Sequence, residues 1–172
     1  MRAELSAAYQ LGKIALISAD YEYLNYNAMN FRDSGDDYDY TDQNSEIQNV
    51  FNPSNNIRIG AEVRATPNVS LRAGYSITGN PWKKEYTTYD ETTQQTVTVD
   101  LANNSDTQSS ISAGFGYRQQ SFFIDFAYRL TMTDKAYKVH EMSYNNTEYI
   151  GKNIADYSGT NNQATLTFGF RF

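Results

Sequence analysis

The sequence of 172 residues predicts an all-β fold, an antiparallel up-and-down transmembrane β-barrel with about seven strands. Three observations support this prediction: apolar residues alternate with polar ones in seven segments, short connections alternate with long ones, and aromatic residues gather near segment ends. No segment shows the 3.6-residue spacing of an amphipathic helix, and no run of 18 apolar residues is present. The mean hydropathy of −0.67 fits this class, because a barrel strand needs apolar residues only at alternate positions.

Each of the seven segments alternates with a period of two, the spacing of a strand with two different faces. Residues 57–65 show the pattern clearly, with isoleucine, alanine and valine at odd positions and arginine, glycine and glutamate at even positions. Such a segment is about as long as a tilted strand that spans a bilayer. The segments lie at residues 2–11, 17–23, 57–65, 69–77, 111–117, 122–130 and 164–172.

The connections between these segments alternate in length. Residues 12–13, 66–68 and roughly 119–121 form short turns, the first two with the glycine, proline and asparagine typical of turns. The other links are long and polar, at about residues 27–55, 79–109 and 131–162. In an up-and-down barrel every second connection lies at the same end. The sequence therefore predicts short turns at one rim and long loops at the other, like the periplasmic turns and extracellular loops of outer-membrane barrels.

Aromatic residues on the apolar parity fall near the segment ends, where two girdles are expected at the membrane interfaces. A soluble sandwich or lipocalin-like barrel also has alternating strands, but it predicts neither these bands nor the loop asymmetry. The expected interface aromatics are Tyr21, Tyr23, Tyr75 and Tyr128 toward the long loops and Tyr9, Tyr117 and Phe122 toward the short turns.

Seven is an odd number, whereas bacterial single-chain barrels have an even number of strands and both termini on the periplasmic side. We therefore expect residues 1–172 to form a single barrel region that is part of a larger barrel. Association of several copies, or rearrangement of the isolated region, is the alternative.

Six stretches, read in order and spacing, resemble the FadL/TodX-type outer-membrane transport proteins. The resemblance implies a 14-stranded monomeric barrel that passes long-chain fatty acids or other hydrophobic compounds across the cell outer membrane. Residues 1–172 would be its C-terminal half, without the N-terminal plug and the early strands. The resemblance assigns no ligand-binding residue to this chain. The stretches are residues 8–13, 16–23, 56–62, 71–75, 111–118 and 123–128.

Charged residues within the segments fall on the polar parity and are expected to face the barrel interior. Opposite charges on adjacent strands can pair there, as a selectivity lining or as the structure of a polar lumen. The predicted lumen-facing residues are Asp20, Glu22, Arg58, Glu62, Arg64, Arg72, Asp125 and Arg129.

The last segment ends in alternating apolar residues with a terminal phenylalanine, which resembles the signal read by the outer-membrane barrel-assembly machinery. An edge strand of this kind is suited to pairing with another strand. The alternative is an ordinary C-terminal strand that ends in phenylalanine. The predicted assembly signal consists of Leu166, Phe168, Phe170 and Phe172.

The composition argues against several classes of function. The absence of cysteine and the single histidine argue against thiol catalysis and against zinc sites, so we expect no enzyme, cofactor or metal. A net charge of −6, from 14 basic and 20 acidic residues, argues against a nucleic-acid partner. The acidic residues at 33–46 suggest either a solvated loop or a calcium site, although their spacing does not match an EF-hand.

These observations predict an outer-membrane channel for passive uptake of hydrophobic small molecules. The expected partners are the lipid bilayer, the transported molecule and the barrel-assembly machinery. Two alternatives remain, namely a small surface barrel whose acidic loops bind a partner and a soluble β-barrel binding module.

Overall fold

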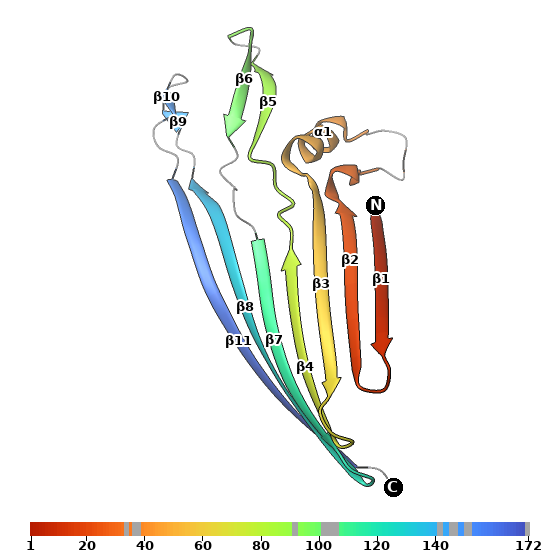
Figure 1. The fold of residues 1–172 in the computed structure, drawn as a ribbon. Coiled ribbons are helices and arrows are strands. Elements are labelled where there is room, and N and C mark those ends of the chain that lie inside the picture. The colour runs from red at the N-terminus through yellow and green to blue at the C-terminus, as the bar shows by residue number, and fades with distance from the viewer. Residues whose placement is uncertain are drawn as a thin grey trace.

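A computed structural model describes residues 1–32, 35, 39–90, 93–100, 107–140, 143–144, 148–149 and 153–170. Its main element is one seven-stranded antiparallel sheet, in which each strand pairs with its nearest neighbour in the chain order (Figure 1). The predicted number and antiparallel order of the strands are confirmed. The strands are β1 (Arg2–Leu11), β2 (Ala15–Asn25), β3 (Pro53–Arg64), β4 (Val69–Thr78), β7 (Thr107–Arg118), β8 (Phe122–His140) and β11 (Asn153–Phe170).

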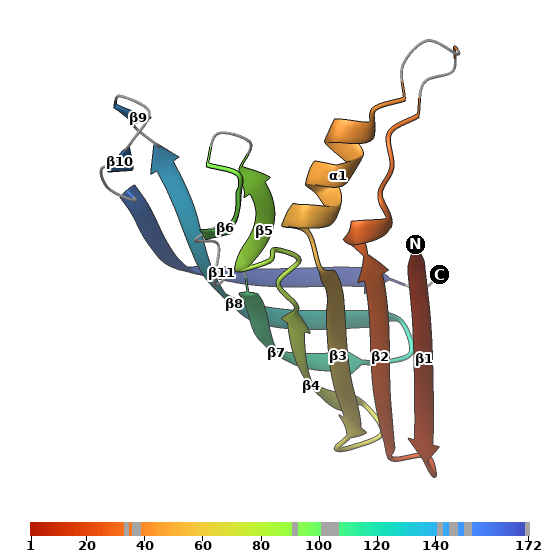
Figure 2. The ribbon, with the colours of Figure 1, turned by 90° about the horizontal axis from the view of Figure 1, so that it is seen from above.

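The sheet is open and strongly curved. Strands β1 and β11 form its edges, and within the described part of the chain each has a neighbouring strand on one side only. Seen from above, the two edge strands run at a steep angle to one another on different sides of the curve (Figure 2). The described residues therefore form a curved antiparallel sheet, and they show no closure into a barrel.

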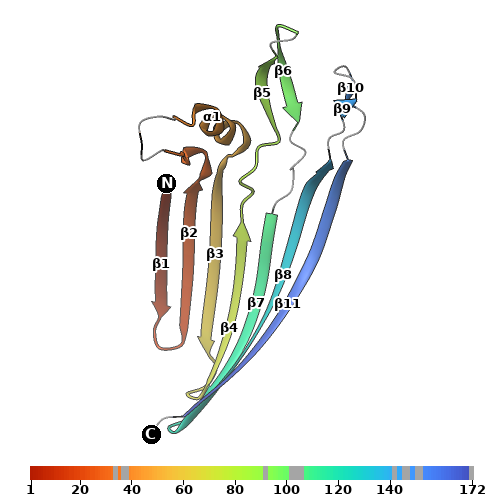
Figure 3. The ribbon, with the colours of Figure 1, turned by 180° about the vertical axis from the view of Figure 1, so that it is seen from behind.

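All short turns lie at one end of the sheet and all long connections at the other (Figures 1 and 3). The turn between β1 and β2 includes Gly12, whose φ of 59° is a conformation that favours glycine. The opposite end holds the 3₁₀ helix η1 (Tyr26–Ala28), the helix α1 (Thr41–Val50) and two small hairpins. The hairpins are β5 (Glu85–Asp90) with β6 (Gln95–Asp100) and β9 (Ser143–Tyr144) with β10 (Glu148–Tyr149).

Helix α1 corrects the expectation of a chain without helices. The helix has ten residues, of which only Ile47 and Val50 are apolar, so its sequence lacks the apolar stripe that predicts a helix. Tertiary contacts hold it instead. The Asn44 side chain accepts a hydrogen bond from the Phe31 backbone N–H at 2.7 Å and donates one to the Phe31 carbonyl at 3.1 Å.

The prediction of a long loop at residues 131–162 is also wrong for much of this range. Strands β8 and β11 stay paired from the Phe122–Phe170 pair to the His140–Asn153 pair. Many paired residues in the added part, such as Asn161 opposite Thr131, are polar, so no alternation marks this part in the sequence. Within the described residues, no helix is long and apolar enough to cross a membrane.

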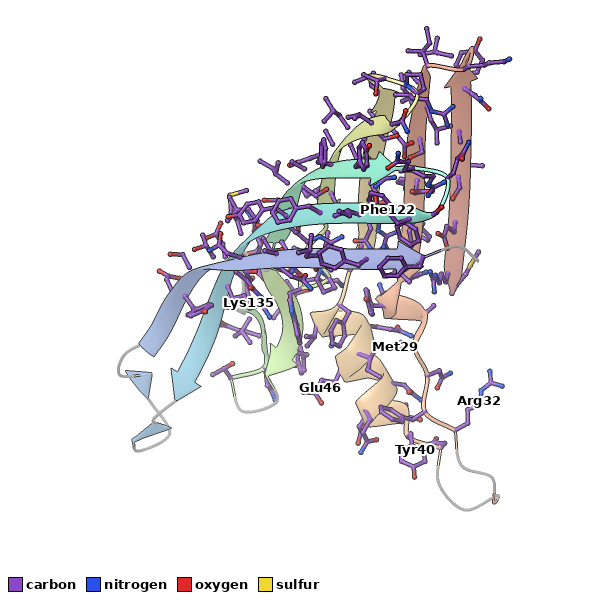
Figure 4. All side chains as sticks on the ribbon, turned by 90° about the horizontal axis from the view of Figure 1, so that it is seen from below. Met29, Arg32, Tyr40, Glu46, Phe122 and Lys135 are labelled. Carbon is purple, nitrogen blue, oxygen red and sulfur yellow. The ribbon has the colours of Figure 1, made fainter. Side chains whose placement is uncertain are left out.

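The two faces of the sheet differ in polarity, and the large apolar side chains are on an exposed face. One face, called the apolar face below, exposes large hydrophobic side chains on every strand, and none of the described large side chains is fully buried. The other, called the polar face, forms the floor of a groove and contains the buried polar residues Glu22, Ser54 and Asn56. Side chains project from both faces in Figure 4, where Phe122 lies on the sheet and Met29, Tyr40 and Glu46 lie beyond the strands.

Candidate functional site on the polar face

A groove of about 610 Å³ runs across the polar face from β2 to β11. Its floor is made of small residues that lie side by side on successive strands. Ser18 is opposite Gly60, Gly60 is opposite Gly74, and Gly74 is opposite Ser112. A Cβ atom on Gly74 would lie 2.8 Å from the Ser112 hydroxyl, so this position has no room for a side chain without displacing its neighbour. The groove is therefore hollowed out by residue size.

An ion-pair cluster borders this floor. The Arg72 Nε lies 2.8 Å from a Glu62 carboxylate oxygen on β3, and its Nη1 lies 2.8 Å from Asp125 on β8. Strand β7 lies between β4 and β8, so the guanidinium must pass over it. Gly114 and Gly116 make this possible, because a Cβ atom on Gly116 would lie 2.6 Å from the Asp125 oxygen and 3.4 Å from the guanidinium nitrogens.

A second cluster surrounds Glu22, near the end of the sheet with the long connections. The Glu22 carboxylate pairs with Arg2 at 2.7 Å and with Arg58 at 3.1 Å, and it accepts a hydrogen bond from the Asn56 amide at 3.1 Å. Arg2 also pairs with Glu4 at 3.1 Å. This carboxylate is 5% exposed as a residue, and each of its oxygens has a donor, as a buried charge requires.

The structure brings together five of the eight charged residues expected to face a lumen. Glu22 and Arg58 belong to one cluster, and Glu62, Arg72 and Asp125 belong to the other. The strand register places the remaining three on the same face, but they form no ion pair within the described part of the chain. These three are Asp20, Arg64 and Arg129.

Three contributors to these clusters were not predicted from the sequence. Arg2 stands on the polar parity of its segment, so parity alone was enough to include it. Asn56 lies just before the predicted start of its segment. The role of Gly116 needs the register of three strands, which no local pattern gives.

All seven expected interface aromatics lie on the apolar face. Near the end with the long connections, the Tyr21 hydroxyl donates a hydrogen bond to Asn55 at 2.6 Å. Tyr128, expected at the same end, lies closer to the short turn, because β8 extends from Phe122 to His140, and its hydroxyl donates a hydrogen bond to Asn162 at 2.5 Å. Near the short turns, the rings of Tyr117 and Phe122 contact each other with centroids 5.9 Å apart. The other three are Tyr9, Tyr23 and Tyr75.

The predicted assembly residues lie on the edge strand β11. Leu166, Phe168 and Phe170 are 56%, 62% and 73% exposed on the apolar face. Phe172 lies outside the described residues.

At the end with the long connections, an aromatic cluster joins the first long connection to the second. The Phe51 ring lies 4.6 Å from the Trp82 ring and 6.3 Å from the Tyr26 ring, measured between centroids. The Lys83 ammonium donates a hydrogen bond to the Gln48 carbonyl at 2.8 Å, near the C-terminal end of α1, where a positive charge is favourable.

The acidic segment before α1 is described only in part, because Asp33, Asp36 and Asp37 lie outside the described residues. Hydrogen bonds from the Thr41 side chain and from its backbone N–H, the latter at 3.1 Å, hold the pKa of Asp39 below its usual value of 3.8. No group of three potential metal ligands occurs in the part of the chain that the structure describes.

Comparisons with family models, with curated proteins and with solved structures find no match to this chain.

Proposed function

We propose that this chain forms part of the wall of an outer-membrane β-barrel through which small hydrophobic molecules, such as long-chain fatty acids, pass without energy input. The observation that supports it is the reversed polarity of the sheet, with exposed Leu, Ile, Phe and Tyr side chains on one face and ion pairs on the other. Such a sheet fits lipid on its apolar face and water on its polar face.

The free energy of transfer favours this placement. A Leu, Ile or Phe side chain is about 1.5–3 kcal/mol more stable in an apolar environment than in water. Every strand of the sheet contributes such side chains, so a hydrocarbon environment would stabilise the sheet at many positions together. The Tyr21 hydroxyl bonded to Asn55, near the end of the sheet with the long connections, suits the level where hydrocarbon meets the polar interface.

The open edges call for further strands. Unpaired backbone N–H and C=O groups are costly in hydrocarbon, so both β1 and β11 need a partner. The sheet has seven antiparallel strands, counting both edge strands, so β1 and β11 run in the same direction. An antiparallel closure then requires an odd number of additional strands, which agrees with the seven further strands that the FadL-type resemblance implies.

Insertion is tested by refolding the chain with phospholipid vesicles and floating the vesicles on a density gradient. We expect the protein to float with the vesicles, to show β-rich circular dichroism and to precipitate when detergent and lipid are removed. A chain that stays monomeric in plain buffer would indicate the soluble binding module instead.

Transport is tested by uptake of a fluorescent long-chain fatty acid in cells that display the protein in the outer membrane. Ala127 lines the groove, whereas Ala19 lies on the apolar face and does not line it, so their tryptophan variants are matched. We expect Ala127→Trp to reduce uptake and Ala19→Trp to leave it unchanged. Insertion without any uptake would favour the surface barrel that binds a partner.

A further inference from the structure

We propose that the groove binds an anionic group, a carboxylate or other small oxyanion, at Arg129. This inference deepens the proposed function, on which it rests for the molecules that reach the groove. The groove is lined by four charged residues, namely Glu62, Arg72, Asp125 and Arg129. Their different surroundings decide which of them remains available to a ligand.

Arg72 is already occupied. Its guanidinium lies 2.8 Å from each of two carboxylates, Glu62 and Asp125, so a second anion near it would meet two negative charges. Arg129 lies in the same groove, is exposed, and makes no ion pair with any residue that the structure describes. It is thus the positive charge that this groove offers to a ligand.

Arg129 also has suitable neighbours. The register places it between Ser112 on β7 and Gln163 on β11, and all three line the groove. The Ser112 hydroxyl makes only a long bond of 3.4 Å to the Gly74 carbonyl. The Gln163 side chain has no hydrogen bond within the described part of the chain. A guanidinium, a hydroxyl and an amide together supply the donors that an oxyanion accepts.

The acidic end of the groove does not cancel this charge. Asp125 stands four residues before Arg129 on β8, which is about 13 Å along an extended strand. The two backbone positions are thus farther apart than the Debye length of about 8–10 Å at physiological salt. Asp125 pairs with Arg72, and no ion pair joins it to Arg129 in the part of the chain that the structure describes, so the two charges interact only weakly. The Arg129 end is therefore locally positive and the Asp125 end locally negative.

The size of the groove indicates what accompanies the anion. A volume of about 610 Å³ is in the range of sites for drug-sized molecules and is much larger than a single small anion. The floor of glycine, alanine and serine beyond Arg129 leaves room for the remainder of such a ligand. The shared chemistry is an oxyanion, which comes either as a free small anion or as the head group of an amphiphile.

The test is a titration of the 15N-arginine-labelled full chain in zwitterionic detergent, observed through the Nε–Hε signals of its arginines. Sodium sulfate and sodium octyl sulfate are the two probes. We expect a saturable shift of the Arg129 signal in the unsubstituted chain. Variants at position 129 lack this signal, so isothermal titration calorimetry gives the affinity of every variant, and we expect it to fall about tenfold or more in Arg129→Gln and less in Arg129→Lys. The control Arg64→Gln removes an arginine from the same face outside the groove, and we expect it to retain the affinity.

Each outcome decides a point. Equal affinity for both probes assigns the site to free anions, and tighter binding of octyl sulfate assigns it to amphiphile head groups. Parallel, unsaturable shifts of the Arg64 and Arg129 signals, or unchanged affinity in Arg129→Gln, would overturn the proposal. Vesicle flotation of the same sample separates the two proposals. A floating protein without the shift refutes the anion site alone, and a shift in a protein that does not float refutes membrane insertion alone.

Discussion

The apolar and polar faces of the sheet are formed by alternate residues of the same strands, yet they satisfy their side chains in different ways. On the polar face, Glu22 and Arg72 find partners within the chain, across two or three strands. On the apolar face, side chains such as Leu166 and Phe168 contact little of the chain and remain exposed. The polar face is thus largely satisfied internally, whereas the apolar face depends on what surrounds it.

This difference teaches where the stability of the sheet comes from. A soluble domain gains most of its free energy of folding from an apolar interior, and the described part of this chain has no large side chain that is fully buried. Backbone pairing and the ion-pair clusters hold the register. In the proposed membrane placement, the surrounding lipid supplies the hydrophobic contribution. Substitutions on the two faces should therefore respond differently to the medium.

The largest expected effect comes from placing a charge on each face of the same strand. Leu166→Arg puts a cation on the apolar face, where we expect a loss of about 2–4 kcal/mol in unfolding free energy in vesicles. Thr165→Arg, its neighbour on the polar face, should change this free energy by no more than about 0.5 kcal/mol. Urea-unfolding curves of both variants in vesicles give the two values. Similar losses in both would mean that the two faces meet the same environment.

A smaller effect is expected within the polar face. In Gly116→Ala the new Cβ atom displaces the Asp125 oxygen that it would approach to 2.6 Å. We expect a loss of about 1–2 kcal/mol, to which the partly exposed ion pair contributes no more than about 1 kcal/mol. In an Asp125→Ala background the same change should be neutral, because the obstructing oxygen is gone.

Denaturant unfolding in detergent of the two single variants and the double variant provides this double-mutant cycle. Gly60→Ala is the control, since its Cβ atom would meet only the Ser18 hydroxyl, at 3.0 Å, which can rotate away. Additive effects of Gly116→Ala and Asp125→Ala would show that the glycine does not serve the ion pair.

The same comparison explains which features were predictable from the sequence. Strands with apolar residues at alternate positions, such as residues 57–65, can be predicted from the sequence because alternation is a local pattern. The part of β8 beyond residue 130 and the part of β11 before residue 163 mix polar and apolar residues at both parities, so only the pairing of residues such as Thr131 with Asn161 reveals these strands. Helix α1 has no apolar stripe, so no local pattern in its sequence indicates a helix. The contact of Arg72 with Asp125 needs the register of three strands and two glycines, which are far apart in the sequence.

A third prediction concerns the aromatic cluster beyond the sheet, which is held by contacts within the chain. Phe51→Ala removes the ring that packs on Trp82, the single tryptophan. This change should weaken the contact between the first and second long connections by about 1 kcal/mol. We expect a red shift and stronger quenching of tryptophan fluorescence, with unchanged strand signal in circular dichroism. Phe31→Ala, in the same connection but packed on Tyr40, is the matched control. A simultaneous loss of strand signal would mean that the cluster supports the sheet itself.

The smallest expected effect is a pH dependence at the start of α1. The helix follows Tyr40, which has a φ of 51° and provides no side-chain cap, so the Asp39 carboxylate accepts the hydrogen bonds of Thr41 instead. These bonds lower the pKa of Asp39, so the charged form is favoured in the folded segment. Their contribution is fully present above the usual value of 3.8 and disappears as the pH falls through the lower value of the folded state. The Thr41 amide signal in NMR should therefore shift between about pH 5 and pH 2. It should stay constant in Asp39→Asn, which cannot titrate, and keep its shift in Asp42→Asn. A Thr41 signal that titrates equally in Asp39→Asn would assign the pH dependence to another group and leave the entry of α1 without a charged acceptor.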